Sequence, residues 1–209
     1  QSSPFSRQVT EIISSNVKDV VHEQLYSKEG YILRWYIERS QIEHFVKTRS
    51  LVCAIDPSDA GGGDDIAMVL MDSYSGEVVM AAQFNETNLL DFTMWLIERL
   101  QEWSNTVFVI ERRSSGVTML DTMLKILPVK GIDPFKRLFN WVTSDPEANQ
   151  ILYEESCQAM ARRDPSLYTR AKRMFGFATS GSGVQSRDTL FGSVLQEATR
   201  TFGDCISDS

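Results

Sequence analysis

The chain has 209 residues of ordinary globular composition, 42% hydrophobic and 23% charged, and is long enough for one substantial core. Its three widely spaced cysteines argue against a disulfide framework and a zinc site, and they favour a reducing, intracellular setting. It has no apolar stretch of about 18 residues and no charged-then-apolar leader, so we expect a soluble protein without a membrane span or a signal peptide.

The leading segment carries apolar residues at helical spacing. This spacing predicts an amphipathic helix over residues 5–27 and a second helix over residues 33–47. We find no catalytic constellation and no phosphate-binding P-loop there, so the chain carries no P-loop ATPase motor of its own. We therefore interpret residues 1–50 as a helical linker, or as the tail of a preceding ATPase domain that this chain lacks.

The apolar pattern changes at Leu51 to short runs rich in β-branched residues. These runs predict strands at residues 51–56, 66–71 and 77–84, which form a three-stranded meander. The elements predicted next are a helix over residues 89–103 with Asn88 among its candidate N-caps, a strand over residues 106–110, and a helix from Ser114 or Ser115 that Pro128 stops.

The last third of the chain has a weaker pattern. We expect a fifth strand at residues 138–142, a helix opening at residues 144–147, an extended segment at residues 174–178, and a final helix over residues 186–202. A meander of three strands followed by helix, strand, helix, strand and helix is the order of the ribonuclease H-like fold. We therefore predict an α/β protein with a mixed central sheet flanked by helices and with an N-terminal helical extension.

Two of the predicted strands end on an acid, the first on Asp56 and the fourth on Glu111. The first and fourth strands are neighbours in the ribonuclease H-like fold, so we expect the two carboxylates to lie side by side. Oxygen ligands without a cysteine or histidine cluster suit Mg²⁺ or Mn²⁺. Two such ions about 3.5–4 Å apart would activate water and stabilise the leaving oxygen of a phosphodiester. We predict Asp56 and Glu111 as catalytic metal ligands and Asp64 as an outer-shell or alternative ligand.

Each of these residues also has an ordinary structural explanation. Asp56 precedes a proline, and this pair commonly starts a turn. Glu111 precedes a helix whose positive end an acid stabilises, and the glycines before Asp64 suit a hairpin turn. Trp141 with Phe139 either packs in the core or stacks on a base. The joint occurrence of two acids at matching strand ends favours the metal site.

The net charge of −7 argues against nucleic acid as a partner, because affinity for phosphates depends on Lys and Arg. Basic residues are nevertheless concentrated between residues 112 and 173, while acids gather at strand ends and at the C-terminus. One interpretation is a basic face beside an acidic metal site, and the other is a solvated surface of mixed charge. Under the first interpretation, the residues expected to contact DNA are Arg112, Arg113, Arg170, Lys172 and Arg173.

Three short motifs stand out: residues 55–64 (Ile-Asp-Pro-Ser-Asp-Ala-Gly-Gly-Gly-Asp), residues 109–111 (Val-Ile-Glu) with residues 114–116 (Ser-Ser-Gly), and residues 176–179 (Gly-Phe-Ala-Thr). Together they resemble the C-terminal nuclease domain of the large terminase subunit of tailed bacteriophages. The resemblance implies an Mg²⁺- or Mn²⁺-dependent endonuclease that cuts concatemeric double-stranded viral DNA during genome packaging. Its implied partners are the ATPase domain of the same full-length protein, a portal and a small terminase subunit, in the host cell cytoplasm.

The resemblance also implies a third essential acid, usually in an Asp-Asp pair after the last strands. This chain has no convincing match, so either Asp204 or Asp208 substitutes, or the third acid lies beyond Ser209. We favour the latter, and we expect residues 51–209 to be a C-terminally incomplete nuclease domain with little activity alone. Two other functions stay open: an actin-like or sugar-kinase-like ATPase, and a non-catalytic docking module of the same fold.

Overall fold

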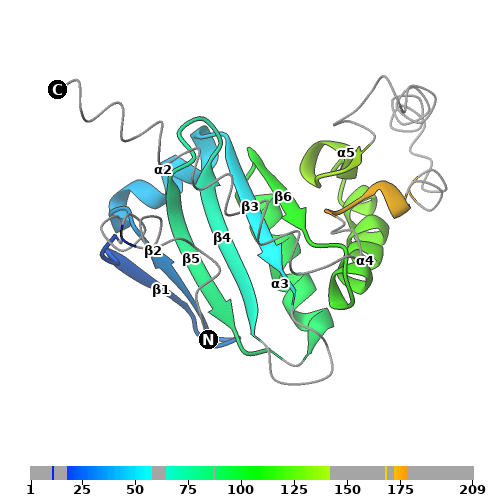
Figure 1. The fold of residues 1–209 in the computed structure, drawn as a ribbon, viewed down its shortest axis with the longest axis horizontal. Helices are drawn as coiled ribbons and strands as arrows, with labels where there is room; N and C mark the ends of the chain where they lie inside the picture. The colour runs from blue at the N-terminus through cyan, green and yellow to red at the C-terminus, as the bar shows by residue number, and fades with distance from the viewer. Residues whose placement is uncertain are drawn as a thin grey trace. The chain divides into compact units, whose positions relative to one another are not determined.

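The computed structural model describes residues 18–57, 65–86, 88–141 and 172–177, together with Glu11 and Tyr168. Apart from Glu11, Lys18 and Asp19, these residues belong to one compact unit that spans residues 20–178. This unit is an α/β structure in which helices flank a six-stranded mixed sheet, as predicted (Figure 1).

The strands of the sheet lie in the order β1-β2-β5-β4-β3-β6. They are β1 (His22–Tyr26), β2 (Tyr31–Trp35), β3 (Leu51–Asp56), β4 (Ile66–Asp72), β5 (Val78–Phe84) and β6 (Thr106–Ile110). The β3 and β6 strands run parallel, whereas the other neighbouring pairs of this sheet run antiparallel. The predicted meander is therefore confirmed as β3, β4 and β5, and the predicted fourth strand, β6, is the parallel neighbour of β3.

The leading segment contributes two strands to this sheet, so the prediction of helix is wrong for residues 22–26 and 33–35. The β1 and β2 strands form a hairpin, in which the N–H of Gly30 donates to the carbonyl of Tyr26. Alternate residues of β2 are buried, namely Tyr31, Leu33 and Trp35. Their period is two and not 3.6, which is the signature of a strand with one buried face. Residues 5–10 and 12–17 of the first predicted helix lie outside the described residues.

The second predicted helix is confirmed only in its later part, as α2 (Arg39–Thr48). β2 joins the sheet by pairing with β5, where Arg34 lies opposite Ala81 and Trp35 opposite Met80. Residues 20–50 therefore belong to the same compact unit as the strands that follow, and that unit begins at Val20 rather than at Leu51.

A tight turn joins β4 to β5 at the end of the sheet where β3 begins. The Asp72 carboxylate accepts hydrogen bonds from the backbone N–H groups of Tyr74 at 2.9 Å and Ser75 at 3.0 Å. The N–H groups of Ser75 and Tyr74 hold the pKa of Asp72 below its ordinary value. Gly76, at φ 69°, closes the turn by donating to the backbone carbonyl of Asp72.

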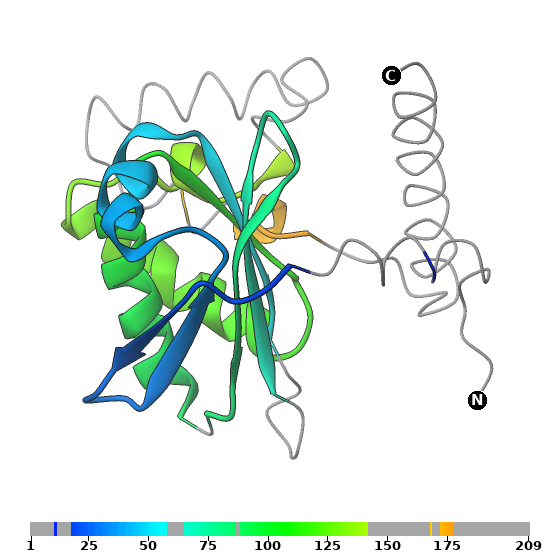
Figure 2. The same cartoon turned by 90° about the vertical axis from the view of Figure 1, so that its left-hand side faces the viewer.

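Two long helices, α3 (Leu89–Glu102) and α4 (Ser115–Val129), lie side by side on one face of the sheet (Figure 2). The side chain of Asn88 caps α3, as predicted. Pro128 does not stop α4, because the helix continues to Val129. It ends instead at a left-handed residue, Gly131 at φ 75°, which is the usual way of terminating a helix with glycine.

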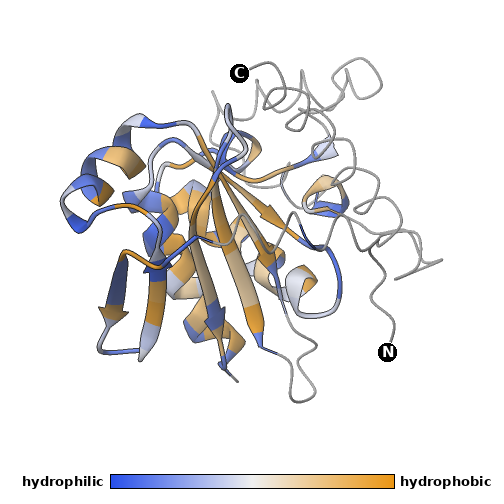
Figure 3. Cartoon of the chain, turned by 60° about the vertical axis from the view of Figure 1, so that its left-hand side comes forward, coloured by the Kyte–Doolittle hydropathy of each residue, from blue (hydrophilic) through white to orange (hydrophobic). Residues whose placement is uncertain are grey.

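The hydrophobic core lies between the sheet and these two helices. Apolar residues follow the strands and the inner faces of the helices in Figure 3. The core includes Leu33, Cys53, Ile55, Met68, Leu70, Met80, Leu96, Phe108 and Leu120. Cys53 carries a free thiol, and burial raises its pKa. It therefore acts as a small apolar side chain within β3.

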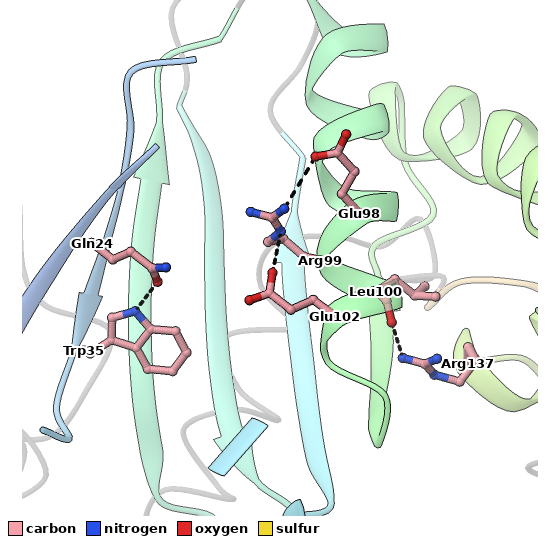
Figure 4. A network of polar contacts seen from close by, with 7 residues as sticks. All are labelled: Gln24, Trp35, Glu98, Arg99, Leu100, Glu102 and Arg137. Atoms are coloured by element: carbon pink, nitrogen blue, oxygen red, sulfur yellow. Dashed lines mark hydrogen bonds and ion pairs between the residues drawn. The ribbon is translucent and has the colours of Figure 1, made fainter. Parts of the chain in front are cut away.

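Arg137 anchors the end of α3 to the start of β6. It ends the short helix α5 (Pro134–Arg137) and donates to the backbone carbonyls of Leu100 and Trp103, both at 2.6 Å. Figure 4 shows the bond to Leu100. Its Nε also donates to the carbonyl of Thr106 at 3.0 Å. Burial lowers the pKa of Arg137. These bonds satisfy backbone carbonyls that the end of a helix otherwise leaves without partners.

Arg99 anchors the opposite side of α3 to β1. Its guanidinium lies 4.4 Å from the ring centre of Tyr26 and makes ion pairs with Glu98 at 3.4 Å and Glu102 at 3.3 Å. Figure 4 shows both ion pairs on the side of α3. The edge hairpin is thus fixed to the helical layer by a cation–π contact.

The strands predicted at residues 138–142 and 174–178 are present only as isolated bridges. Leu138 bridges Phe108 of β6, Asn140 bridges Phe175, and Phe177 bridges Glu111. A short 3-10 helix, η1 (Lys172–Met174), precedes the last of these bridges. Val142, Ala178 and the helices predicted at residues 144–147 and 186–202 lie outside the described residues. Within the part of the chain that is described, no helix has the length and low polarity that crossing a membrane would require.

Candidate metal centre

The two predicted acids lie next to each other at one end of the sheet, which we call the acid end. The last pair in the parallel register of β3 and β6 is Ile55 opposite Ile110. The next residue of each strand is the acid, Asp56 after Ile55 and Glu111 after Ile110. The N–H of Glu111 donates to the carbonyl of Ile55 at 3.1 Å, which continues the ladder past the end of β6. Backbones paired in this way lie about 4.8 Å apart. Both acids therefore start from adjacent backbone positions.

The alternation of side chains places both acids on the face of the sheet away from α3 and α4. Leu51, Cys53 and Ile55 are buried on the helical face, whereas Ala54 and Asp56 are exposed on the other. Glu111 is half-buried and follows the buried Ile110 in the same alternation. Among the bonds of the described residues, none is accepted by the Asp56 carboxylate. Its oxygens are thus available to a ligand from solvent.

The start of α4 packs directly against the acid end. A Cβ atom on Gly116 would lie 1.9 Å from the carbonyl oxygen of Glu111 and 3.0 Å from Cγ of Pro57, so a side chain there would displace both strand ends. Ser114 turns the chain into α4 with φ 49°, an uncommon value for a residue other than glycine. Residues 114–116 (Ser-Ser-Gly) belong to the motif that resembles terminase nucleases. The structure shows why the third position is glycine, because the start of α4 approaches the ends of β3 and β6 too closely for a side chain.

A second segment, residues 172–177, fixes the backbone on the other side of Glu111. The N–H of Phe177 donates to the carbonyl of Ile110 at 2.9 Å, and the N–H of Arg112 donates to the carbonyl of Phe177 at 2.8 Å. Gly176, at φ 88°, passes so close to α4 that a Cβ atom would lie 2.6 Å from Cδ1 of Leu120. Glu111 is therefore held between β3, α4 and residues 172–177.

Arg112 has a structural partner that the sequence did not reveal. Its Nη1 donates to the backbone carbonyls of Lys172 at 2.8 Å and Phe175 at 3.2 Å. The guanidinium therefore ties residues 172–177 to the turn after β6. Arg113, Lys172 and Arg173 have exposed side chains near the acid end, where a phosphate could reach them. Their contact with DNA, and that of Arg112, stays a prediction.

Three predicted ligands, Asp64, Asp204 and Asp208, lie outside the described residues, as does the predicted DNA contact Arg170. Among the described residues no group of three or more His, Cys, Asp and Glu side chains is placed to hold a metal ion. Two carboxylates nevertheless fit Mg²⁺, which proteins often bind through one or two carboxylates with water and substrate phosphates completing the shell. The donor chemistry at Asp56 and Glu111 thus suits a hard divalent cation.

The case for a functional site at the acid end rests on the geometry described above, because the comparisons with known proteins add nothing to it. No protein-family model matches this chain, and no curated protein sequence matches it.

Proposed function

We propose that this protein is a metal-dependent endonuclease that hydrolyses phosphodiester bonds of double-stranded DNA. The observation that supports this proposal most is the placement of Asp56 and Glu111 at matching ends of two parallel, neighbouring strands. A second support is the strand order β5-β4-β3-β6, in which the first strand of a meander lies beside the fourth strand. This is the arrangement of a ribonuclease H-like core, which we propose as the fold.

The chain's own residues would divide the work at the acid end. Asp56, which is exposed, would supply oxygens to a divalent cation, and Glu111 would supply a second carboxylate from a backbone held on both sides. The bound ions would activate water and stabilise the charge on the leaving oxygen. The protein has a net charge of −7, so DNA would need positive side chains near the acid end. The exposed residues that would neutralise its phosphates there are Arg113, Lys172 and Arg173.

The resemblance of residues 55–64, 109–116 and 176–179 to the terminase nuclease motifs narrows the proposal. On that basis the substrate is concatemeric viral DNA, and the partners are an ATPase domain of the same protein, a portal and a small terminase subunit. The third metal ligand would come from Asp64, Asp204 or Asp208, or from residues beyond Ser209.

Cleavage of supercoiled plasmid with Mn²⁺ tests the proposal. We expect linear product to form slowly with the wild-type chain, in keeping with the low activity expected of an incomplete domain, and none to form with EDTA. Asp56→Asn and Glu111→Gln should each lower the rate by more than about 100-fold, the upper end of losses seen when residues that merely support a metal ligand are changed. Both substitutions keep the size of the side chain, so folding should be preserved, and circular dichroism checks this.

Metal binding provides a readout that does not depend on activity. Titration of Mn²⁺ followed by electron paramagnetic resonance should detect sites that both variants weaken. Cleavage that survives in Asp56→Asn would contradict the proposal. So would hydrolysis of ATP that depends on Asp56 in the absence of any DNA cleavage, because that result fits the actin-like alternative.

A further inference from the structure

Three aromatic rings form a cluster beside the acid end. Phe139 and Trp141 meet edge to face with ring centres 5.2 Å apart, and Phe177 lies 6.1 Å from Phe139. Trp141 and Phe177 are 6.4 Å apart and nearly parallel, with an angle of 29° between their planes. We call Phe139, Trp141 and Phe177 the aromatic cluster.

The cluster differs from the other aromatic groups of the unit in its exposure. Trp141 and Phe177 are each 40% exposed, whereas Trp35, Trp95 and Trp103 are at most 3% exposed. Single exposed aromatic residues are common on protein surfaces, but adjacent rings that share an exposed face often mark a binding site. The sequence left open whether Trp141 packs in the core or stacks on a base, and its exposure excludes full burial in the core.

The position of the cluster links it to the predicted acids and to exposed cations. Phe177 bridges Glu111 in a parallel arrangement, so the two side chains project from the same face of that ladder. Two exposed cations, Lys172 and Arg173, precede Phe177 on the same short segment. A third exposed cation, Arg113, lies two residues after Glu111. Flat rings next to positive charges match a strand of unpaired nucleotides, which presents bases and phosphates together.

We infer that the aromatic cluster binds single-stranded DNA by stacking an unpaired base on the partly exposed rings of Trp141 and Phe177, while Arg113, Lys172 and Arg173 contact its phosphates. The assignment of DNA as the ligand rests on the proposed function, but the binding step itself needs neither metal nor cleavage. Stacking on an aromatic side chain is worth about 1–3 kcal/mol per base. This corresponds to a change of about 5- to 150-fold in the dissociation constant when the ring is removed.

Binding is measured in EDTA, with a fluorescein-labelled oligothymidylate and a blunt duplex of the same length. We expect Trp141→Leu to weaken binding of the single strand by about 5- to 150-fold and to change binding of the duplex far less. Trp141→Phe keeps a ring and should retain most of the affinity. Because leucine preserves apolar bulk without a π face, the pair of variants separates stacking from packing.

Tyr74→Ala is the matched control, since Tyr74 is an aromatic side chain that is 91% exposed in the turn between β4 and β5, at the opposite end of the sheet. Its removal should leave both affinities unchanged. Trp141 is also the one exposed residue among the four tryptophans of the chain, so the oligothymidylate should quench its fluorescence. This quenching should be absent from Trp141→Phe.

The inference is overturned if Trp141→Leu binds the single strand as the wild type does, or if Trp141→Leu and Tyr74→Ala lose affinity equally. Loss of single-strand and duplex binding to the same degree also overturns it, because stacking requires an unpaired base. Failure of the nuclease proposal would give a different result from failure of this inference. In that case the single strand would still bind in EDTA, but the plasmid would stay intact with Mn²⁺.

Discussion

The two ends of the central sheet each carry an aspartate at the end of a strand, and they use it differently. At the end formed by residues 72–76, which we call the turn end, Asp72 is 8% exposed and accepts hydrogen bonds from Tyr74 and Ser75. At the acid end, Asp56 is exposed and lies beside Glu111. The same side chain after the same kind of strand is thus a structural group in one place and a candidate ligand in the other.

The difference lies in what surrounds each carboxylate. Asp72 is satisfied by N–H groups two and three residues later, so its partners are local and its role is complete within the turn. The surroundings of Asp56 come from distant parts of the chain: β6, the start of α4 with Gly116, and residues 172–177 behind Glu111. An exposed acid that is surrounded by segments from distant parts of the chain is typical of a functional site, whereas a turn is completed by neighbouring residues.

Replacement of the two aspartates should separate activity from stability. We expect Asp56→Asn to lower Mn²⁺-dependent cleavage by more than about 100-fold and to leave the urea midpoint almost unchanged. Asp72→Ala should lower the urea midpoint and leave cleavage within experimental error, because it removes the Oδ1 acceptor of the Tyr74 and Ser75 N–H groups, which lies at the turn end. Equal effects of both variants on cleavage would remove the distinction between the two ends.

Alanine at two glycines should test how tightly each end is packed. Gly116→Ala places a Cβ atom 1.9 Å from the Glu111 carbonyl oxygen, and we expect it to lower the free energy of unfolding by about 2–3 kcal/mol, as overpacking does. Gly76→Ala meets nothing within 4 Å and only strains a φ of 69°, which costs about 1 kcal/mol. Urea denaturation measures both values. A smaller loss for Gly116→Ala than for Gly76→Ala would show that α4 can move away from the acid end.

The two arginines after Glu111 should differ in the same assay. Removing the Arg112 guanidinium breaks its bonds to the carbonyls of Lys172 and Phe175. We expect Arg112→Ala to cost about 1 kcal/mol, because solvent competes for bonds that are partly exposed. Arg113→Ala should change stability by less than about 0.5 kcal/mol, as exposed substitutions usually do. Hydrogen exchange at the Phe177 amide should accelerate in Arg112→Ala, and unchanged exchange there would contradict the proposed tie.

The smallest effect expected is a dependence of stability on pH at the turn end. The folded-state pKa of Asp72 lies below its ordinary value of 3.8, so at acid pH the unfolded state binds more protons than the folded state. The contribution of Asp72 to stability is therefore fully present well above 3.8 and is lost as pH falls from that value through the lower folded-state pKa. As pH falls below 3.8, wild-type urea midpoints should fall more steeply than those of Asp72→Asn, which has no titrating carboxyl at this position. If the urea midpoints of the wild type and of Asp72→Asn changed with pH in parallel, the N–H groups of Tyr74 and Ser75 would not favour the charged form of Asp72.

Local patterns account for the parts of the fold that the sequence predicted. The runs ending at Asp56 and Glu111 have buried alternate residues that fit only a strand, and Asn88 identifies the start of α3 by its own side chain. In residues 22–26 and 33–35 we predicted helix from the apolar spacing, but these residues form strands, and β2 pairs with β5, more than forty residues later. The pairing itself lies outside any short window, although the period-two spacing of Tyr31, Leu33 and Trp35 is a local sign of a strand that the helical interpretation missed.

The sequence by itself thus predicted that an acid follows each of two strands, because the apolar period is a local property. The expectation that these strands are neighbours came from the order of elements, which is that of the ribonuclease H-like fold. The tertiary structure alone decided what surrounds those acids. The Arg112 side chain bonds to carbonyls about sixty residues away, Gly116 is required by the Glu111 carbonyl, and Trp141 joins Phe177 in an exposed cluster. Each of these depends on contacts between segments that are far apart in the chain, and the energies of such contacts are set by packing rather than by residue order.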